Sequence, residues 1–462
     1  MIKKEAKSVT KSGFKAVKTV TLCLAFLLIF RFWVTVANSP IELIVVSITI
    51  LLTMHSVFTL AWMLYSWDNP EEAHKHRSPR NFRQPLISFT ALVPARHEEK
   101  VIAQTIRAIS KMNYPSNLCE TLVLCREDDI GTINAVQQEL LRLEVSNIKL
   151  KIFNDYPINK PHSLNIGLKE ASNDVVAVFD AEDEPHPDIY NIVNTTMLIE
   201  KVEVVQSGVQ LMNYKTRWFT LLNCMEYYFW FKSGLLFFTN IGKVSPLGGN
   251  TVFFMKNFLY QIKGWDEKCL TEDADVGVSL VAAGAKIKVI YDEQHATREE
   301  APIDIKTFIK QRTRWNHGFL QILAKGNWLK LNSNRQKLTT LYVLLTPLFQ
   351  LLIFLYIPLG LYIAFTTKTS VVISLFSFVP LFLLTLQLST IIIGAHGFTK
   401  SYSLKYNWYL PIIFVLTYLP YQFLLIISSV RAVFRFVSNK NLWEKTAHVN
   451  AHREIVESVY VN

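Results

Sequence analysis

The feature that most constrains this chain is a set of five long apolar stretches on either side of a polar middle region. They cover residues 19–37, 41–65, 338–366, 369–397 and 406–430, and the third and fifth contain no charged side chain. A transmembrane helix needs about 20 apolar residues. Core helices of a large globular protein are the alternative, but helices of this length without a charge are more typical of a bilayer. The sequence therefore predicts a multi-pass membrane protein.

Charges around the first stretch predict the orientation. Six lysines precede it against a single acid, Glu5, and lysines before a first span favour the cytoplasm. A secretory signal peptide is the alternative, but the stretch ends without a clear small-residue cleavage site and a second stretch follows at once. Because two spans return the chain to its starting side, we expect a cytoplasmic middle region in a protein of the cell (inner) membrane.

The C-terminal part leaves the number of crossings open. Three further spans would place the tail outside, yet the tail is basic, with Arg431, Arg435, Lys440, Lys445 and Arg453. Positive charge close to a span favours the cytoplasm. Either one of the three stretches re-enters or lies in the interface, or a further crossing is present around residues 347–358.

The overall charge and the cysteines exclude some classes of protein. The formal net charge of +11 suits an anionic membrane surface or a phosphate-bearing substrate. Nucleic acid is not expected as a partner, because the sequence has no zinc knuckle, glycine–aromatic repeat or helix-turn-helix pattern. The five cysteines are scattered without a Cys-x-x-Cys pair, which argues against a disulfide framework and a zinc site.

Between residues 85 and 325 the pattern changes to alternating strands and helices. Short apolar, β-branched runs predict strands at residues 87–93, 121–125, 149–153, 174–179, 202–205, 251–255 and 286–290. Helical patterns between them, such as residues 98–111 and 133–143, predict an α/β domain with a mostly parallel sheet covered on both faces. In such sheets, ligands bind at the carboxyl ends of the strands.

Three acidic clusters follow predicted strands or lie between them: Glu127 to Asp129, Asp180 with Glu182 and Asp183, and Glu272, Asp273 and Asp275. A single acid at such a place is often a helix cap or a turn former. Three clusters converging on one sheet edge in a basic protein indicate a site instead.

The spacing of these acids suits chemistry on a nucleotide. Carboxylates one or two residues apart, such as Asp180 and Glu182, can share Mg²⁺ or Mn²⁺ and leave positions for substrate phosphates. A carboxylate on another loop could accept the proton of an acceptor hydroxyl. Lys160 and Arg96 follow predicted strands and could hold a diphosphate, although each could also be a solvated surface charge.

The segment Gln311-Arg312-Thr313-Arg314-Trp315 lies in a run with helical apolar spacing from residue 304 to 330. The run predicts an amphipathic helix at the membrane surface. There, Trp315 could anchor the helix and Arg314 could contact lipid phosphate. Alternatively, Trp315 offers a stacking face for a sugar and Arg314 pairs with pyrophosphate. An aromatic run at residues 218–238 could similarly line an acceptor path or rest on the bilayer.

Taken together, these motifs resemble the membrane-bound, inverting family-2 glycosyltransferases, such as cellulose, hyaluronan and chitin-oligosaccharide synthases. The matching elements occur in the family's order and have membrane segments on both sides. They are Asp128-Asp129, Asp180-Ala181-Glu182-Asp183, Thr271-Glu272-Asp273 and Gln311 to Trp315, with further echoes in Val93 to Arg96, in Lys160 with Asn165, and in Gly248-Gly249-Asn250.

The resemblance implies a GT-A-type nucleotide-sugar-binding domain inserted between transmembrane helices. It implies donor-binding roles for Arg96, Asp128, Asp129, Lys160 and Asp180, and Asp273 as the general base. Glu272, Gln311, Arg314 and Trp315 would frame the acceptor end. The metal, Mg²⁺ or Mn²⁺, would be held by Asp180 with Glu182 or Asp183, because the family's Asp-Ala-Asp is replaced here by Asp-Ala-Glu-Asp.

The expected organisation has four parts: a basic tail with two spans (residues 1–84), the catalytic domain ending in the interfacial helix (85–325), a bundle of three or more spans (326–432) and a basic tail (433–462). The leading hypothesis is a processive hexosyltransferase that adds sugars from a UDP-sugar to a β-linked polysaccharide and exports it. The alternative is transfer of one sugar to a lipid, such as diacylglycerol or a polyprenyl phosphate. Membrane lipids are further expected partners.

Overall fold

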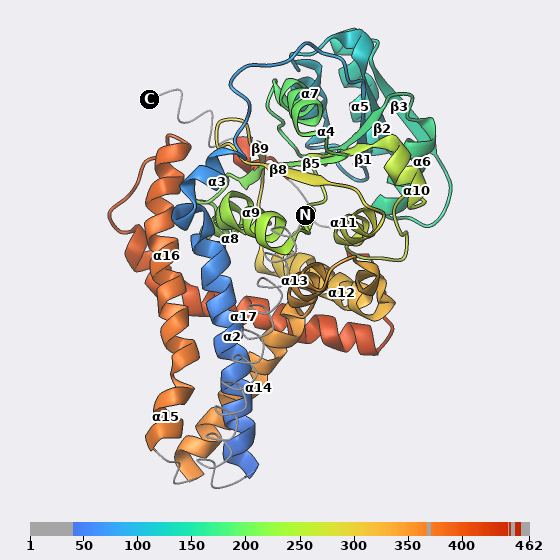
Figure 1. Cartoon of the computed structure of the whole chain (residues 1–462). Coiled ribbons are helices and arrows are strands. Elements are labelled where there is room, and N and C mark those ends of the chain that lie inside the picture. Colours follow the sequence, from blue (N-terminus) through green and yellow to red (C-terminus); the bar gives the residue numbers. More distant parts are fainter. Residues whose placement is uncertain (1–39, 367–370, 442, 445–448, 454–462) are drawn as a thin grey trace, which may run out of the picture. The chain divides into compact units, whose positions relative to one another are not determined.

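The computed structural model describes residues 40–366, 371–441, 443–444 and 449–453 (Figure 1). The first expected span and the lysines before it lie outside the described residues. The chain divides into two compact units, one made of Thr59–Leu351 with Leu386–Asn462 and the other of Met1–Phe58 with Leu352–Thr385. The first unit contains the expected catalytic domain.

A seven-stranded sheet forms the centre of the expected catalytic domain (Figure 1). Its strand order is β3-β2-β1-β4-β7-β5-β8. All seven expected strands are present in it. Their bounds are β1 (Phe89–Ala95), β2 (Cys119–Arg126), β3 (Ile148–Phe153), β4 (Val175–Val178), β5 (Val204–Ser207), β7 (Val252–Met255) and β8 (Ile287–Ile290). Four pairings are parallel and only β7 runs antiparallel, to both β4 and β5. The expected mostly parallel sheet is confirmed.

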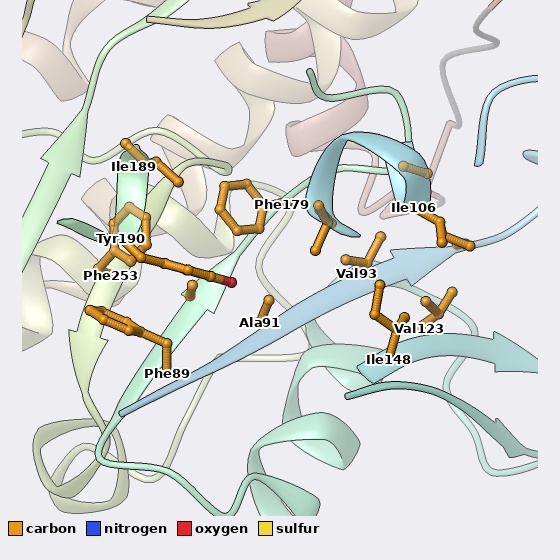
Figure 2. Close-up of a cluster of buried hydrophobic side chains, with 14 of the residues drawn as sticks. Phe89, Ala91, Val93, Ile106, Val123, Ile148, Phe179, Ile189, Tyr190 and Phe253 are labelled. Carbon is orange, nitrogen blue, oxygen red and sulfur yellow. The ribbon is translucent and has the colours of Figure 1, made fainter. Parts of the chain in front are cut away.

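Apolar side chains alternate along β1 and supply both faces of the sheet. Phe89, Ala91 and Val93 point to one face, where they pack with Tyr190 and Phe253 in a fully buried cluster (Figure 2). Helices α4 (Ile102–Ser110), α5 (Ile130–Leu143) and α7 (Ile189–Glu200) cover this face. The opposite face, which includes Leu92 of β1, is covered by α6 (Lys160–Glu170), α10 (Lys256–Gln261) and α11 (Glu272–Ala282). Burying both faces explains why these strands are almost continuously apolar.

A second, two-stranded parallel sheet was not expected from the sequence. It pairs β6 (Val209–Leu211) with β9 (Thr297–Glu299). An isolated bridge joins Arg298 to Glu184, with Glu184 N donating to Arg298 O at 3.0 Å. This pairing brings β9 beside the acidic turn that follows β4.

The aromatic run forms α8 (Trp218–Phe229), two π-helical segments (Trp230–Gly234 and Phe238–Gly242) and α9 (Leu235–Phe237) between them. Most of its large side chains are buried inside this unit, including Tyr228, Phe229 and Phe238. The run is therefore mainly a core element, and its alternative as a surface resting on the bilayer does not suit these side chains.

The amphipathic run forms α12 (Ile305–Lys325), followed by a 3₁₀ turn (Asn327–Lys330) and α13 (Asn334–Leu344). Residue 318 is a glycine on the face of α12 that meets the start of α11. A Cβ placed there would lie 2.7 Å from the backbone nitrogen of Thr271. Only glycine permits this approach, which brings the Thr271-Glu272-Asp273 and Gln311-to-Trp315 segments together.

The last long helix, α17 (Leu410–Val437), packs along α12 in the same direction. The rings of Phe308 and Tyr421 lie 5.5 Å apart, and Asn316 Nδ2 donates to Ser429 Oγ at 2.7 Å. Near the C-terminal ends of the contact, the rings of His317 and Phe436 lie 5.9 Å apart. Ser428 and Ser429 are both completely buried, so α17 presents a polar stripe to α12.

Four helical segments among the described residues are long and apolar enough to cross a membrane. They are α2 (Pro40–Asp68), residues 346–363 of α14 (Thr346–Thr366), α15 with α16 (Val371–Ser377 and Val379–Ser401), and α17. The expected stretch at residues 338–366 is divided, because its first part belongs to α13. Within the smaller unit, Val46 and Ile373 are buried together, and the hydroxyls of Thr49 and Tyr356 lie 3.0 Å apart. Two short helices, α3 (Pro70–His74) and a 3₁₀ turn (Ser116–Leu118), complete the described elements.

Candidate active site

The first group of site residues lies at the carboxyl ends of β1 and β2. Arg96 forms a two-pronged ion pair with Asp128, with Nη1 to Oδ1 at 2.9 Å and Nη2 to Oδ2 at 3.1 Å. Arg126 also donates to Asp128 Oδ2 at 3.2 Å. The hydrogen bond from Arg96 lowers the pKa of Asp128. The Asp128 side chain is nonetheless 48% exposed, so a ligand can reach it.

The neighbouring Asp129 is buried and shapes the loop. Its Oδ2 accepts from the backbone nitrogen of His97 at 2.6 Å, and its Oδ1 accepts from Thr132 N at 3.4 Å as the N-cap of α5. Because both oxygens bond backbone N–H groups, Asp129 ties the loop after β1 to the start of α5. Of the two expected donor-binding aspartates, the structure therefore exposes Asp128.

The second group surrounds the ammonium of Lys160, in the first turn of α6. Lys160 Nζ forms an ion pair with Asp180 Oδ1 and donates to Gly249 O at 2.9 Å. A Cβ placed on Gly249 would lie 3.3 Å from Lys160 Nζ and 3.1 Å from Asp273 Oδ2. Asp180 after β4 and Asp273 at the start of α11 therefore face the same ammonium, as the sequence predicted for one shared site.

Charge at this point is dense and shielded from water. Burial lowers the pKa of Lys160, but the carboxylates of Asp180 and Glu272 outweigh that effect and leave it raised. Burial raises the pKa of Asp273, and the Ala274 N–H together with Lys160 and Arg314 offsets part of the rise. Burial and the charge of Asp273 raise the pKa of Glu272 to about 7. Carboxyl groups with raised pKa values in a charged site are candidates for proton transfer.

In the turn Asp180-Ala181-Glu182-Asp183, the Asp183 carboxylate binds groups that hold the turn, whereas the Asp180 carboxylate contacts Lys160. Asp183 Oδ2 accepts from Asp180 N at 2.9 Å, and its Oδ1 accepts from Asn250 Nδ2 at 2.8 Å. Both oxygens of Asp183 thus hold the turn together. Glu182 is also buried, and burial together with the charge of Asp180 raises its pKa to about 8.

These carboxylates fit a divalent cation that substrate phosphates help to hold. No group of three His, Cys, Asp or Glu side chains arranged around a metal occurs among the described residues. Mg²⁺ is commonly bound by one or two carboxylates together with substrate phosphates. Asp180 and Glu182 supply hard oxygen donors of this kind. Burial is the main cause of the raised pKa of Glu182, and a bound cation would favour its charged form.

The third group lies on α12 and meets the second. Arg314 Nη1 donates to Leu270 O at 3.2 Å, just before Glu272 and Asp273, and its charge offsets part of the rise that burial causes in the pKa of both. Gln311 is buried on the same helix. Trp315 is half-buried, and its ring centroid lies 6.5 Å from that of Tyr227 on α8. The structure thus brings Arg314 next to the expected base, with Gln311 and Trp315 on the same helix.

Arg312 has a structural role in this third group of residues, because it links α12 to α8. It forms an ion pair with Glu226, donates to Asn223 Oδ1 at 2.5 Å and lies over the Trp315 ring at 4.7 Å. These contacts fix the ring of Trp315 between α8 and α12.

Several residues in this region were not identified from the sequence. Glu299 on β9 is buried, and its pKa is raised by burial and by the acids of the turn after β4. Glu300 follows it, and Arg453 from the C-terminal tail contacts the backbone of the same turn. The adjacent acids Glu299 and Glu300 were a usable signal, whereas Arg453 was considered only for its charge beside a membrane span.

Comparisons with known proteins identify the family to which the chain belongs. Residues 85–318, just over half of the chain, match the model of the glycosyltransferase like family 2. The chain belongs to this family. It has the GT-A fold, and this fold resembles the structure of a mannosyltransferase, PcManGT from Pyrobaculum calidifontis in complex with GDP-Man and Mn²⁺. That match has a TM-score of 0.56 and 18% identity, and it covers 84% of this chain and 99% of the other.

Curated relatives fall into different groups by name. The probable glycosyltransferase YdaM of Bacillus subtilis is 24% identical over 81% of this chain and 90% of its own length. A β-monoglucosyldiacylglycerol synthase of Trichormus variabilis is 27% identical over 53% of this chain. The glucomannan 4-β-mannosyltransferase 7 of Arabidopsis thaliana is 26% identical over 50% of this chain. The chain spans about half the length of the latter two proteins, 52% and 43% respectively.

Gly249 offers a test of the shared site. We expect Gly249→Ala to lower kcat roughly tenfold or more, because its Cβ would displace the Asp273 carboxylate or the Lys160 ammonium by a few tenths of an ångström. The control is Gly248→Ala, whose Cβ would meet Gln206 at an ordinary 3.5 Å. Steady-state kinetics and thermal unfolding of both detergent-solubilised variants are the measurements. Equal effects of the two substitutions on kcat would contradict the crowding described here.

Proposed function

We propose that this protein is a metal-assisted, inverting hexosyltransferase that takes its sugar from a nucleoside-diphosphate sugar, with a UDP-sugar as the expected donor. The observation that carries the proposal is the meeting of Asp180 and Asp273 around Lys160. A site of this kind can hold a diphosphate on one side and activate a hydroxyl on the other.

The proposed reaction is a single displacement at the anomeric carbon. The acceptor hydroxyl gives its proton to the Asp273 carboxylate as its oxygen bonds to the anomeric carbon from the face opposite the diphosphate. The bond from that carbon to the diphosphate oxygen breaks, and the electron pair leaves with the nucleoside diphosphate. Attack from the opposite face inverts the configuration at the anomeric carbon.

Cationic side chains offset the charge that grows on the leaving group. Lys160 lies beside Asp180, and Arg314 approaches from α12. When bound, Mg²⁺ or Mn²⁺ would add Lewis-acid stabilisation of the leaving diphosphate. Asp180 and Glu182 are its proposed ligands, because both Asp183 oxygens are used within the turn. Asp128, held by Arg96, is the proposed contact for the nucleoside.

For the acceptor, our leading proposal remains a growing β-linked polysaccharide, passed through the membrane segments. The half-buried Trp315 beside Tyr227 supports it, because aromatic faces stack on sugar rings. Transfer to a lipid such as diacylglycerol is the second candidate, supported by the relatives named β-monoglucosyldiacylglycerol synthases. We further propose that the catalytic domain faces the cytoplasm, where nucleotide sugars are made.

The base assignment predicts the effect of Asp273→Asn. We expect kcat to fall about 10²- to 10⁴-fold, because the amide cannot accept the hydroxyl proton. Donor binding, followed by isothermal titration calorimetry, should change little. Asp304→Asn is the matched control, because Asp304 caps α12 through Thr307 N and asparagine can retain that bond. Near-full activity of Asp273→Asn would show that another group accepts the proton.

The metal assignment predicts different outcomes for neighbouring acids. Chelation with EDTA should abolish transfer, and Mn²⁺ or Mg²⁺ should restore it. We expect Glu182→Gln to raise the metal concentration for half-maximal activity at least about tenfold, because a metal ligand is lost. It should not lower Tm, because the substitution removes a charge that is costly to bury. Asp183→Asn should lower stability by about 1–3 kcal/mol, because it weakens the bonds to Asp180 N and Asn250. The reverse pattern would assign Asp183 as the ligand.

The nature of the product separates the two acceptors. Inverted membrane vesicles would be supplied with labelled UDP-sugars, and with GDP-mannose as a second donor type. A polysaccharide synthase is expected to put label into a high-mass or water-insoluble fraction. Label extracted into organic solvent would favour the lipid acceptor, and products with only one added sugar would exclude polymerisation. Vesicles carrying Asp273→Asn give the background.

A further inference from the structure

The C-terminal tail is far from the Asp180–Asp183 turn in sequence, but it contacts the backbone of that turn in the fold. The described part that does so is Val449–Arg453, which we call the tail segment. Its backbone binds Glu300, with Val449 N to Oε1 at 2.5 Å and Ala451 N to Oε2 at 2.6 Å. Asn450 Nδ2 donates to Lys100 O at 2.8 Å. Three bonds thus fix the tail segment beside the catalytic domain.

Arg453, at the end of the tail segment, hydrogen-bonds both α4 and the Asp180–Asp183 turn. Its Nη1 donates to Gln104 Oε1 on α4 at 2.6 Å and to Asn450 Oδ1 at 2.8 Å. Its Nη2 donates to Asp183 O at 3.0 Å and to Glu182 O at 3.2 Å. The planar guanidinium can serve both sides at once, because its donors point in fixed, divergent directions.

A third carbonyl of the turn is held through the same network. Arg453 Nη2 also donates to Thr105 Oγ1 at 3.1 Å, and Thr105 Oγ1 in turn donates to Ala181 O at 2.7 Å. The backbone carbonyls of residues 181, 182 and 183 therefore all accept bonds from the side of α4 and the tail segment. Because the Asp183 side chain bonds Asp180 N from within, the backbone of the turn is fixed along its length.

The chemistry of these contacts matters for the site. Arg453 bonds the backbone oxygens of the turn, so it places a positive charge beside the acids without hydrogen-bonding the carboxylates of Asp180 and Glu182. An arginine paired directly with those carboxylates would compete with a cation for the same oxygens. Groups that orient metal ligands from outside the coordination sphere commonly change metal affinity or activity when they are lost.

We propose that Arg453 is a positioning residue for this reaction, which the tail segment places behind the Asp180–Asp183 turn to set the carboxylates of Asp180 and Glu182 for the cation and the diphosphate. This inference rests on the proposed function for its catalytic consequence. Its structural part, the holding of the turn by the tail segment, can be tested without any activity.

The experiment compares full-length Arg453→Ala, Arg453→Lys and wild-type protein in detergent. Hydrogen–deuterium exchange without metal or donor reports on the backbone around residues 175–188. We expect faster exchange there in Arg453→Ala and an intermediate rate in Arg453→Lys, which keeps the charge but cannot reach α4 and the turn together. In activity assays, Arg453→Ala should raise the Mn²⁺ concentration for half-maximal rate roughly 10- to 100-fold. Arg142→Ala is the control for loss of a charge, because Arg142 is 57% exposed and pairs with Glu139 on α5.

A second variant covers the possibility that Arg453→Ala fails to fold. Ala451→Pro removes the N–H that binds Glu300 and leaves every charge in place. It should give the same exchange and the same metal dependence as Arg453→Ala. Unchanged exchange of the turn in both variants would overturn the proposal. A lower Tm with an unchanged Mn²⁺ requirement would overturn it as well, because the tail segment would then serve stability alone. If wild-type protein transfers no sugar from any donor, the proposed function fails, while the exchange data still decide whether Arg453 holds the turn.

Discussion

The ammonium of Lys160 is the interaction on which the rest of the site depends. Asp180, Glu182, Glu272 and Asp273 come from separate parts of the chain into a largely buried volume, where like charges repel strongly. Lys160 lies between the turn after β4 and the start of α11, and its bond to Gly249 O fixes it there. One lysine cannot balance this many carboxylates, and burial together with neighbouring acids raises the pKa values of Glu182, Glu272 and Asp273. The folded site therefore carries excess negative charge where a cation would bind together with the donor diphosphate.

The sequence predicted the sheet well because parallel strands that are buried on both faces consist of short apolar, β-branched runs. All seven strands of the main sheet lie within a few residues of the expected positions. The strands of the small sheet were missed, because β6 and β9 have three residues each and β9 consists of Thr297, Arg298 and Glu299. The antiparallel direction of β7 was not predictable either, since it is decided by packing between β4 and β5 rather than by its own residues.

The same limit applies within the site. Acids at the carboxyl ends of strands could be found from the sequence, because the geometry of parallel sheets brings those ends together. Which of two adjacent acids faces a ligand could not. Asp128 is exposed while Asp129 bonds His97 N, and Asp183 bonds Asp180 N. Each choice is made by backbone N–H groups whose positions exist only in the folded chain. The role inferred for Arg453 likewise depends on a contact between distant parts of the sequence.

The position of the tail also bears on how the chain crosses the membrane. Arg453 bonds Asp183 O and Gln104, so the tail segment lies on the same side as the catalytic domain. If the segments between them cross a membrane, they must then cross it an even number of times. Residues between the domain and the tail supply α14, the α15–α16 pair and α17 as candidates. The buried serines of α17 face α12, where Asn316 bonds Ser429, and Ser429 Oγ in turn donates to Gln350 of α14. Small polar side chains also join neighbouring helices inside membranes, so this polar stripe is compatible with an α17 that crosses as part of a bundle. The basic residues Arg431 and Arg435 lie in the last two turns of α17, and both form ion pairs with Glu444, so their charge is paired within the chain.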